Sequence, residues 1–139
     1  MDGGKESRAE SKESVIALVT SAAETALSLS PDFALFQETD TSSTRSHHVN
    51  ERTLIADVFS SFQSVFAVNY HSAYLMYPIF EPHGKSNSGM LTLSKAAISS
   101  AVRRSLPISS SLSKLLDLDR CYSVSRIPAE NGKEFVLYN

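Results

Sequence analysis

Apolar residues recur at helical spacing near the start of the chain. From residue 11 to residue 30 they follow one another every three or four positions: Val15, Val19, Ala22, Ala26 and Leu29. This spacing is typical of one face of an amphipathic α-helix. Ser11 is a suitable N-cap. We expect the helix to end near Ser30, because the residue before a proline disfavours helical geometry.

A second run of apolar residues predicts a helix over residues 51–67. Seven positions share one face: Leu54, Ile55, Val58, Phe59, Phe62, Val65 and Phe66. Asn50 is a suitable N-cap, and Val49 and Leu54 have the spacing of a hydrophobic staple. We expect this helix to organise the core, with Phe59 and Phe62 buried.

The segment between these helices combines a short apolar stretch with a polar one. Ser30, Pro31 and Asp32 form a helix-start signal, which predicts a short helix carrying Phe33, Leu35 and Phe36. Such acidic and apolar segments can dock into the groove of a partner, so these three residues are a candidate partner-binding site. The alternative is a small helix that covers the chain's own core.

Residues 38–48 hold no apolar side chain and predict a flexible Ser/Thr-rich linker.

The C-terminal half alternates short helical and extended patterns. Residues 68–82 predict an extended segment, 83–89 a loop and 90–93 a short strand. Helices are expected over residues 95–105 and 110–117. The chain then ends in a hairpin over residues 121–138, because Asn131-Gly132 is a strong signal for a tight turn. With these two residues as the loop, Glu130 would pair with Lys133.

The order of these elements resembles a winged helix-turn-helix domain. The resemblance is carried by Met90–Thr92 as the small strand, Lys95–Ser105 and Ser110–Asp117 as the helix pair, and Cys121–Tyr138 as the wing. It implies a helix-rich α+β fold over residues 50–139. Before it come a disordered segment (1–10), an N-terminal helical extension (11–37) and the linker (38–49).

Charge is divided unevenly between the two parts of the chain. Residues 1–83 hold five Lys and Arg against eleven Asp and Glu, whereas residues 84–139 hold eight against four. A basic C-terminal part suggests contact with nucleic acid. The candidate residues lie on the predicted helix pair and hairpin: Arg103, Arg104, Ser110, Lys114, Arg126 and Lys133.

Motifs for catalysis or for a cofactor are not evident. The four histidines and the single cysteine, Cys121, lack the spacing of a zinc site, and no nucleophile or phosphate-loop motif is present. One cysteine and no secretory or spanning apolar segment predict an intracellular protein of the nucleus or cytoplasm. We therefore expect a protein that is not an enzyme and holds no metal or cofactor. Instead we expect a regulatory module that binds a partner protein, either alone or as part of a complex that contains nucleic acid. The alternative is a DNA- or RNA-binding protein.

Overall fold

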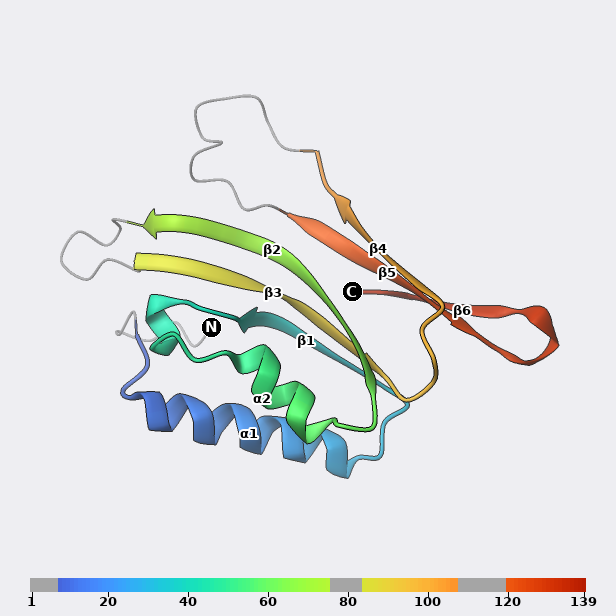
Figure 1. Ribbon diagram of the computed structural model, residues 1–139, viewed down its shortest axis with the longest axis horizontal. Helices are drawn as coiled ribbons and strands as arrows, with labels where there is room; N and C mark the ends of the chain where they lie inside the picture. The colour runs from blue at the N-terminus through green and yellow to red at the C-terminus, as the bar shows by residue number, and fades with distance from the viewer. Residues whose placement is uncertain (1–7, 76–83, 108–119) are drawn as a thin grey trace.

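The computed structural model describes residues 8–75, 84–107 and 120–139. These residues form two α-helices, six strands and two short 3-10 helices (Figure 1). In chain order the elements are α1 (Lys12–Ser28), β1 (Phe33–Asp40), η1 (Thr44–Ser46), α2 (Glu51–Val58), β2 (Gln63–Leu75), β3 (Gly84–Ser94), β4 (Ser100–Ser105), β5 (Cys121–Pro128), η3 (Glu130–Gly132) and β6 (Glu134–Tyr138).

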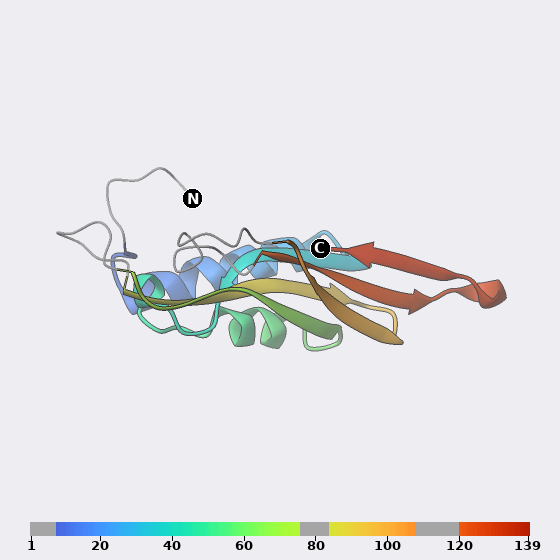
Figure 2. The same cartoon turned by 90° about the horizontal axis from the view of Figure 1, so that it is seen from above.

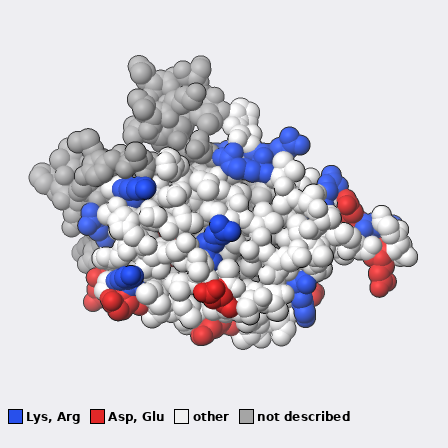
Figure 3. Space-filling view, viewed as in Figure 1, with Lys and Arg blue, Asp and Glu red and all other residues white. Residues whose placement is uncertain are grey.

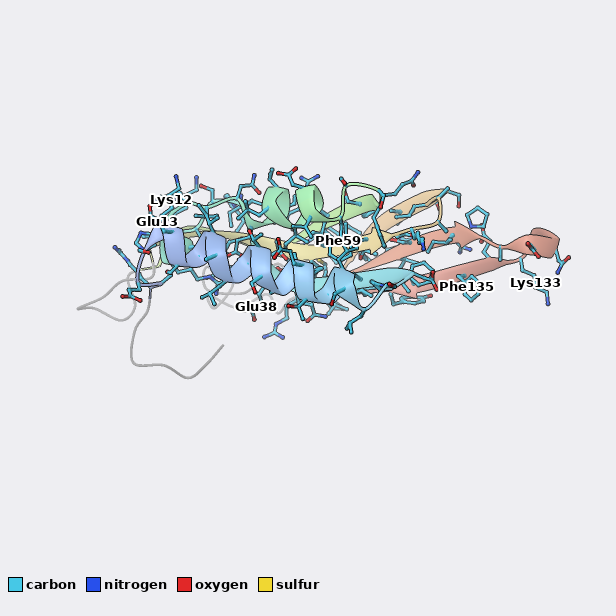
Figure 4. All side chains as sticks on the ribbon, turned by 90° about the horizontal axis from the view of Figure 1, so that it is seen from below. Lys12, Glu13, Glu38, Phe59, Lys133 and Phe135 are labelled. Carbon is cyan, nitrogen blue, oxygen red and sulfur yellow. The ribbon has the colours of Figure 1, made fainter. Side chains whose placement is uncertain are left out.

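The first sheet has the order β1-β3-β2, and all its pairs are antiparallel. Both helices lie along this sheet (Figure 1). Their contact with it forms the buried core: Ala23, Ala34, Ile55, Phe59, Leu91 and Leu93. Phe59 lies between α2 and the sheet (Figure 4) and is 1% exposed. Its predicted burial is confirmed, whereas Phe62 is only partly buried.

The second sheet has the order β4-β5-β6. Its C-terminal end, at Asn139, contacts β3 of the first sheet on the face away from the core. Thr92 lies between the core residues Leu91 and Leu93, so its side chain points to that opposite face. There the Asn139 side chain donates to Thr92 Oγ1 at 3.0 Å. The Phe33 and Phe135 rings add a contact at 6.5 Å between centroids. The β5–β6 hairpin extends beyond the first sheet (Figures 1 and 2).

The expected helix-rich winged-helix fold is therefore wrong, because strands dominate the described residues. Residues 33–40 and 100–105 are strands rather than helices. The loop expected at 83–89 belongs to β3 from Gly84 onward. The helix expected over 51–67 ends at Val58, and β2 begins at Gln63. The helix expected over 110–117 lies outside the described residues.

The C-terminal hairpin is present, but its loop is longer than expected. The last pair is Pro128 with Glu134, so five residues form the connection. Asn131 and Gly132 both have φ of 68°, the left-handed conformation that such residues tolerate. The pairing of Glu130 with Lys133 does not form, and this changes which side chains of β6 share a face with those of β5.

The N-terminal helix begins and ends close to the predicted positions, but Ala22 and Leu29 of its predicted apolar face are exposed. Ser11 is the N-cap, and its Oγ accepts a hydrogen bond from Ser14 N–H at 3.0 Å. Val15 and Ala23 are the buried positions of α1. No α-helix in the described part of the chain is long and apolar enough to cross a membrane.

Candidate functional site

A cavity of about 660 Å³ opens where the two sheets meet beside the helix-free face of the first sheet. Its walls come from β1, β2, β3, β5 and the segments beside them. The polar side chains relevant to its chemistry are Gln37, Glu38, Arg45, Asn69, Arg120 and Asn139. These residues are far apart in the sequence, and the fold brings them to one cavity.

Two irregularities in the first sheet lie at the level of this cavity. The β1–β3 register shifts between Phe36 and Thr39, and the β2–β3 register shifts between Val68 and Tyr70. Gly89 of β3 is the partner of both Thr39 and Val68. Bulges of this kind redirect side chains and are frequent beside active sites.

The bulge in β1 directs Glu38 to the cavity. Glu38 has φ of 55°, which is uncommon for a residue with a side chain. Backbone strain of this kind concentrates at functional sites, where the surrounding structure maintains it. The bulge in β2 similarly leaves Asn69 without a register partner on β3, and Asn69 also lines the cavity.

Arg45 connects Glu38 to a buried carboxylate. Its Nε and Nη2 atoms each donate to Asp40 at 3.0 Å, and Asp40 is only 2% exposed. Its Nη1 atom lies 3.8 Å from Glu38 Oε2. The hydrogen bonds to Asp40 raise the pKa of the Arg45 guanidinium, and partial burial opposes this rise. Arg45 is therefore a fixed positive charge at the cavity wall.

Glu51 completes the network from the first turn of α2. Its Oε2 atom accepts a hydrogen bond from Asp40 N–H at 2.9 Å. Burial raises the pKa of the Glu51 carboxyl, whereas the hydrogen bond from Asp40 N–H acts in the opposite direction. The network thus joins the end of β1, the segment around η1 and the start of α2.

The difference in stability between Glu51→Gln and wild type should shift in favour of the variant as the pH rises from 4 to neutral. The folded state holds the Glu51 proton more tightly than the unfolded chain, so wild-type stability falls as pH rises from about 4.5 through the raised pKa. Glutamine retains an oxygen that can accept from Asp40 N–H and does not titrate. Melting temperatures from pH 4 to 8 should diverge as pH rises. Glu24→Gln, at an exposed position of α1, is the control; parallel profiles for Glu51→Gln and wild type would contradict the prediction.

Two amides fix the side of the cavity next to the second sheet. Gln37 Nε2 donates to Asn139 Oδ1 at 3.3 Å. Asn139 Nδ2 donates in turn to Leu91 O at 3.3 Å and to Thr92 Oγ1. This chain of hydrogen bonds orients the Asn139 amide before any ligand binds.

The described residues do not by themselves form a metal centre. They contain no group of three or more His, Cys, Asp or Glu side chains that could hold a metal ion. Asp40 is engaged by Arg45, and Glu51 by a backbone N–H. The cavity instead combines the Glu38 carboxylate with the positive charges of Arg45 and Arg120.

The arginines predicted to bind nucleic acid are divided between the two faces of the second sheet: Arg104 and Arg126 share one face, and Arg103 lies on the other. Arg103 pairs in register with Ser123, and its Nε donates to Val68 O at 2.8 Å. Arg104 is on the opposite face of β4, because neighbouring strand residues alternate. Arg126 forms an ion pair with Glu134, in which Nη1 lies 2.7 Å from Oε2. Ser110 and Lys114 lie outside the described residues.

Lysine and arginine are also dispersed on the wider surface. In Figure 3 they form several separate groups on the visible face. Figure 4 shows Lys133 at the tip of the β5–β6 hairpin, far from Glu38. The cavity, rather than the predicted basic surface, is where the fold gathers polar side chains.

The predicted partner-binding residues Phe33, Leu35 and Phe36 lie in β1. Phe36 points to the core, where its ring centroid is 6.0 Å from that of Phe59. Phe33 points to the second sheet, and Leu35 is 42% exposed. Their role in binding a partner stays a prediction.

Glu38, Arg45 and Asn69 were not among the residues that the sequence predicted to form a site. One signal was present for Glu38: an apolar run, Phe33–Phe36, precedes a run of polar residues. Interpreted as a strand, this run would have placed Glu38 and Asp40 at the end of a sheet strand. No local signal links these residues to Asn69 or Arg120.

Comparisons with known proteins give similarity at the level of structure. No family model matches the sequence, and no curated protein matches it. An endonuclease/exonuclease/phosphatase family protein from Leptotrichia buccalis C-1013-b has a similar structure, with a TM-score of 0.64 and 13% identity over 91% of this chain. An endonuclease/exonuclease/phosphatase from Beutenbergia cavernae DSM 12333 has a TM-score of 0.61 and 16% identity over 86% of this chain.

The match covers 48% of the Leptotrichia protein and 31% of the Beutenbergia protein, so this chain spans about half or less of either. The similarity contradicts the winged-helix resemblance. It also contradicts the expected non-enzymatic regulatory module, because the proteins that share this fold are named as enzymes. The alternative, a DNA- or RNA-binding protein, gains no support. At these identities the comparison establishes the fold: a sheet-rich arrangement similar to part of endonuclease/exonuclease/phosphatase proteins.

Proposed function

We propose that this chain contributes one wall of the active site of a phosphate-ester hydrolase. Endonucleases, exonucleases and phosphatases all cleave a phosphorus–oxygen bond with water, and the chain resembles proteins with these names. The observation that carries the proposal is the bulge in β1, which directs Glu38 to a cavity also lined by Arg45 and Arg120.

The cavity residues suit the two requirements of this reaction. The attacking water must lose a proton, and a carboxylate at the cavity wall can accept it as a general base. Negative charge on the phosphate oxygens must also be stabilised, and arginine donors match such oxygens well. We assign the first role to Glu38 and the second to Arg120.

This proposal requires that other parts of the site come from outside the described residues, because the match covers only 48% of the Leptotrichia protein. Many nucleases and phosphatases use metal ions. The described side chains do not assemble a metal site, and we assign no step to a metal. A nuclear or cytoplasmic location and a partner protein are part of the proposal, and the single cysteine supports the location.

Glu38→Gln should reduce hydrolysis strongly. The assay measures release of p-nitrophenol from bis(p-nitrophenyl) phosphate and from p-nitrophenyl phosphate, with and without EDTA. We expect the wild-type chain to hydrolyse one of them. Glu38→Gln should lower kcat by about 10²- to 10⁴-fold, the usual contribution of a general base.

Glu24→Gln is the matched control, because Glu24 is exposed on α1 and remote from the cavity. An NMR titration with inorganic phosphate tests binding separately. It should shift the amide signals of Glu38, Arg45 and Asn69. Wild-type protein that neither binds phosphate nor hydrolyses either ester would refute the proposed function.

A further inference from the structure

We propose that the outer face of α1 is the interface of a reversible homodimer, in which α1 of one copy packs antiparallel against α1 of a second copy. Leu18 is 70% exposed and Leu29 is 78% exposed, the highest values among the large apolar side chains of the described residues. A single exposed leucine is ordinary on a protein surface. Two on one face of one helix indicate a surface that another helix covers.

Leu18 and Leu29 belong to a continuous stripe that is separate from the core side of α1. Every member of this stripe is exposed: Leu18, Ala22, Thr25 and Leu29. Their spacing of four, three and four positions places them on one face of a helix, as in the seam of a coiled coil. Leu29 continues this face because, as the C-cap, it keeps an αR backbone conformation. The core side of the helix carries Val15 and Ala23 instead.

The stripe can be covered without burying a charge or an unpaired hydroxyl. Thr25 Oγ1 donates to Ser21 O at 2.8 Å, so this hydroxyl is already paired within the helix. Helical geometry places the three charged residues of α1 off the stripe: Lys12, Glu13 and Glu24. Figure 4 shows Lys12 and Glu13 together at the N-terminal end of α1. A surface helix usually carries its charges on the face away from the core, so an uncharged outer stripe indicates a contact surface.

The order of side chains in the stripe identifies a second copy of the chain as the occupant. A large, two smaller and a large side chain follow one another, and the spacing is the same when it is read in either direction. Antiparallel packing about a two-fold axis therefore places Leu18 against Leu29 of the second copy, and Ala22 against Thr25. Such a dimer uses the same surface on both copies, and a stripe with this symmetry meets that condition.

Electrostatics also favours the antiparallel arrangement. It places the positive N-terminal end of one α1 beside the negative C-terminal end of the other. The last turn of α1 has no basic residue of its own to offset that negative charge. A contact between two helices of this length is small, below the roughly 1,200 Å² that stable complexes bury. We therefore expect a dimer that forms reversibly at high protein concentration.

Sedimentation velocity over a concentration range that reaches the millimolar level measures the dimer, with a reducing agent that keeps Cys121 free. Wild type should form a concentration-dependent dimer. Leu18→Glu alone and Leu29→Lys alone should each raise the dissociation constant at least about tenfold, because a buried leucine contact is lost at both ends of the helix pair. Ala17→Glu is the control: Ala17 is exposed on α1 but turned by about 100° from Leu18, so the dimer should remain.

A mixture of the variants Leu18→Glu and Leu29→Lys tests the antiparallel arrangement. The introduced carboxylate then faces the introduced ammonium at one end, and the native leucines meet at the other end. The mixture should form a mixed dimer more readily than either variant dimerises alone. Both positions are exposed, so circular dichroism should show folded variants.

Three results would overturn the inference. The first is a wild type that stays monomeric at millimolar concentration. The second is a dimer that both single variants retain, because the stripe would then not be its interface. The third is a mixture that associates no better than its components, because Leu18 and Leu29 of different copies would then not meet.

Discussion

Phe59→Ala is expected to lower the free energy of unfolding by about 3–5 kcal/mol, the usual cost of truncating a buried phenylalanine. Phe59 is 1% exposed. Its ring meets those of Phe62 and Phe36 edge-on, with centroids 5.0 Å and 6.0 Å away. The helix α2 has only eight residues and depends on this packing, because short helices are marginal alone.

Urea denaturation followed by circular dichroism measures this effect. Phe135→Ala is the matched control, because the same atoms are removed at a position that is 61% exposed. It should cost clearly less than Phe59→Ala. Equal costs for the two variants would show that the contact between α2 and the sheet is not the main core of the protein.

Helix starts were predictable because their chemistry is local. Asn50 accepts a hydrogen bond from Thr53 N–H at 3.1 Å, and Ser11 caps α1 in the same way. Capping depends on residues three positions apart, so the sequence alone reveals it. The end of α2 was harder to predict. Apolar spacing continues through Phe62 to Phe66, although Val65 and Phe66 pair with β3.

The strand β4 was mistaken for a helix because its own pattern does not show a strand. All six of its residues are exposed. Ala101 and Val102 match helical spacing with residues before them, yet they lie on opposite faces of the strand. Pairing with β5 determines its conformation. A strand that depends on a distant partner gives little local signal.

The hairpin illustrates how a turn determines the faces of a sheet. A two-residue loop at Asn131-Gly132 would have placed Phe135 and Leu137 with Val124. The five-residue loop instead pairs Val124 with Tyr138 and Ser125 with Leu137. A register shift of one residue reverses the face of each side chain. The turn residues were identified correctly, but the loop length was not evident from them.

The candidate site escaped prediction for a related reason. Glu38, Asn69 and Arg120 come from three segments that only the tertiary fold brings together. A bulge becomes visible only when the register of both strands is known. Residues 38–48 were predicted to be a flexible linker because they hold no apolar side chain, yet part of this segment is buried. Its Asp40, Ser43 and Ser46 are buried through hydrogen bonds rather than through apolar packing.

Gly89→Ala is expected to destabilise the protein by about 1–3 kcal/mol, the range for inserting atoms into a packed interior. A Cβ atom at Gly89 would lie 2.5 Å from Ala67 O and 2.6 Å from Phe66 Cζ. The first of these atoms is backbone, so β2 and β3 would have to separate. The Phe66 ring could move, but the Ala67 carbonyl could not without disturbing the bulge beside Asn69.

Thermal and urea unfolding of Gly89→Ala, alone and with Phe66→Leu, test this explanation. Shortening Phe66 should not rescue Gly89→Ala, because the Ala67 carbonyl remains in the way. Gly132→Ala is the control: its Cβ would meet nothing within 4 Å, so only the cost of φ at 68° applies. That cost is about 1–2 kcal/mol. Full rescue by Phe66→Leu would show that the aromatic ring, rather than the close approach of the strands, requires glycine beside the two bulges.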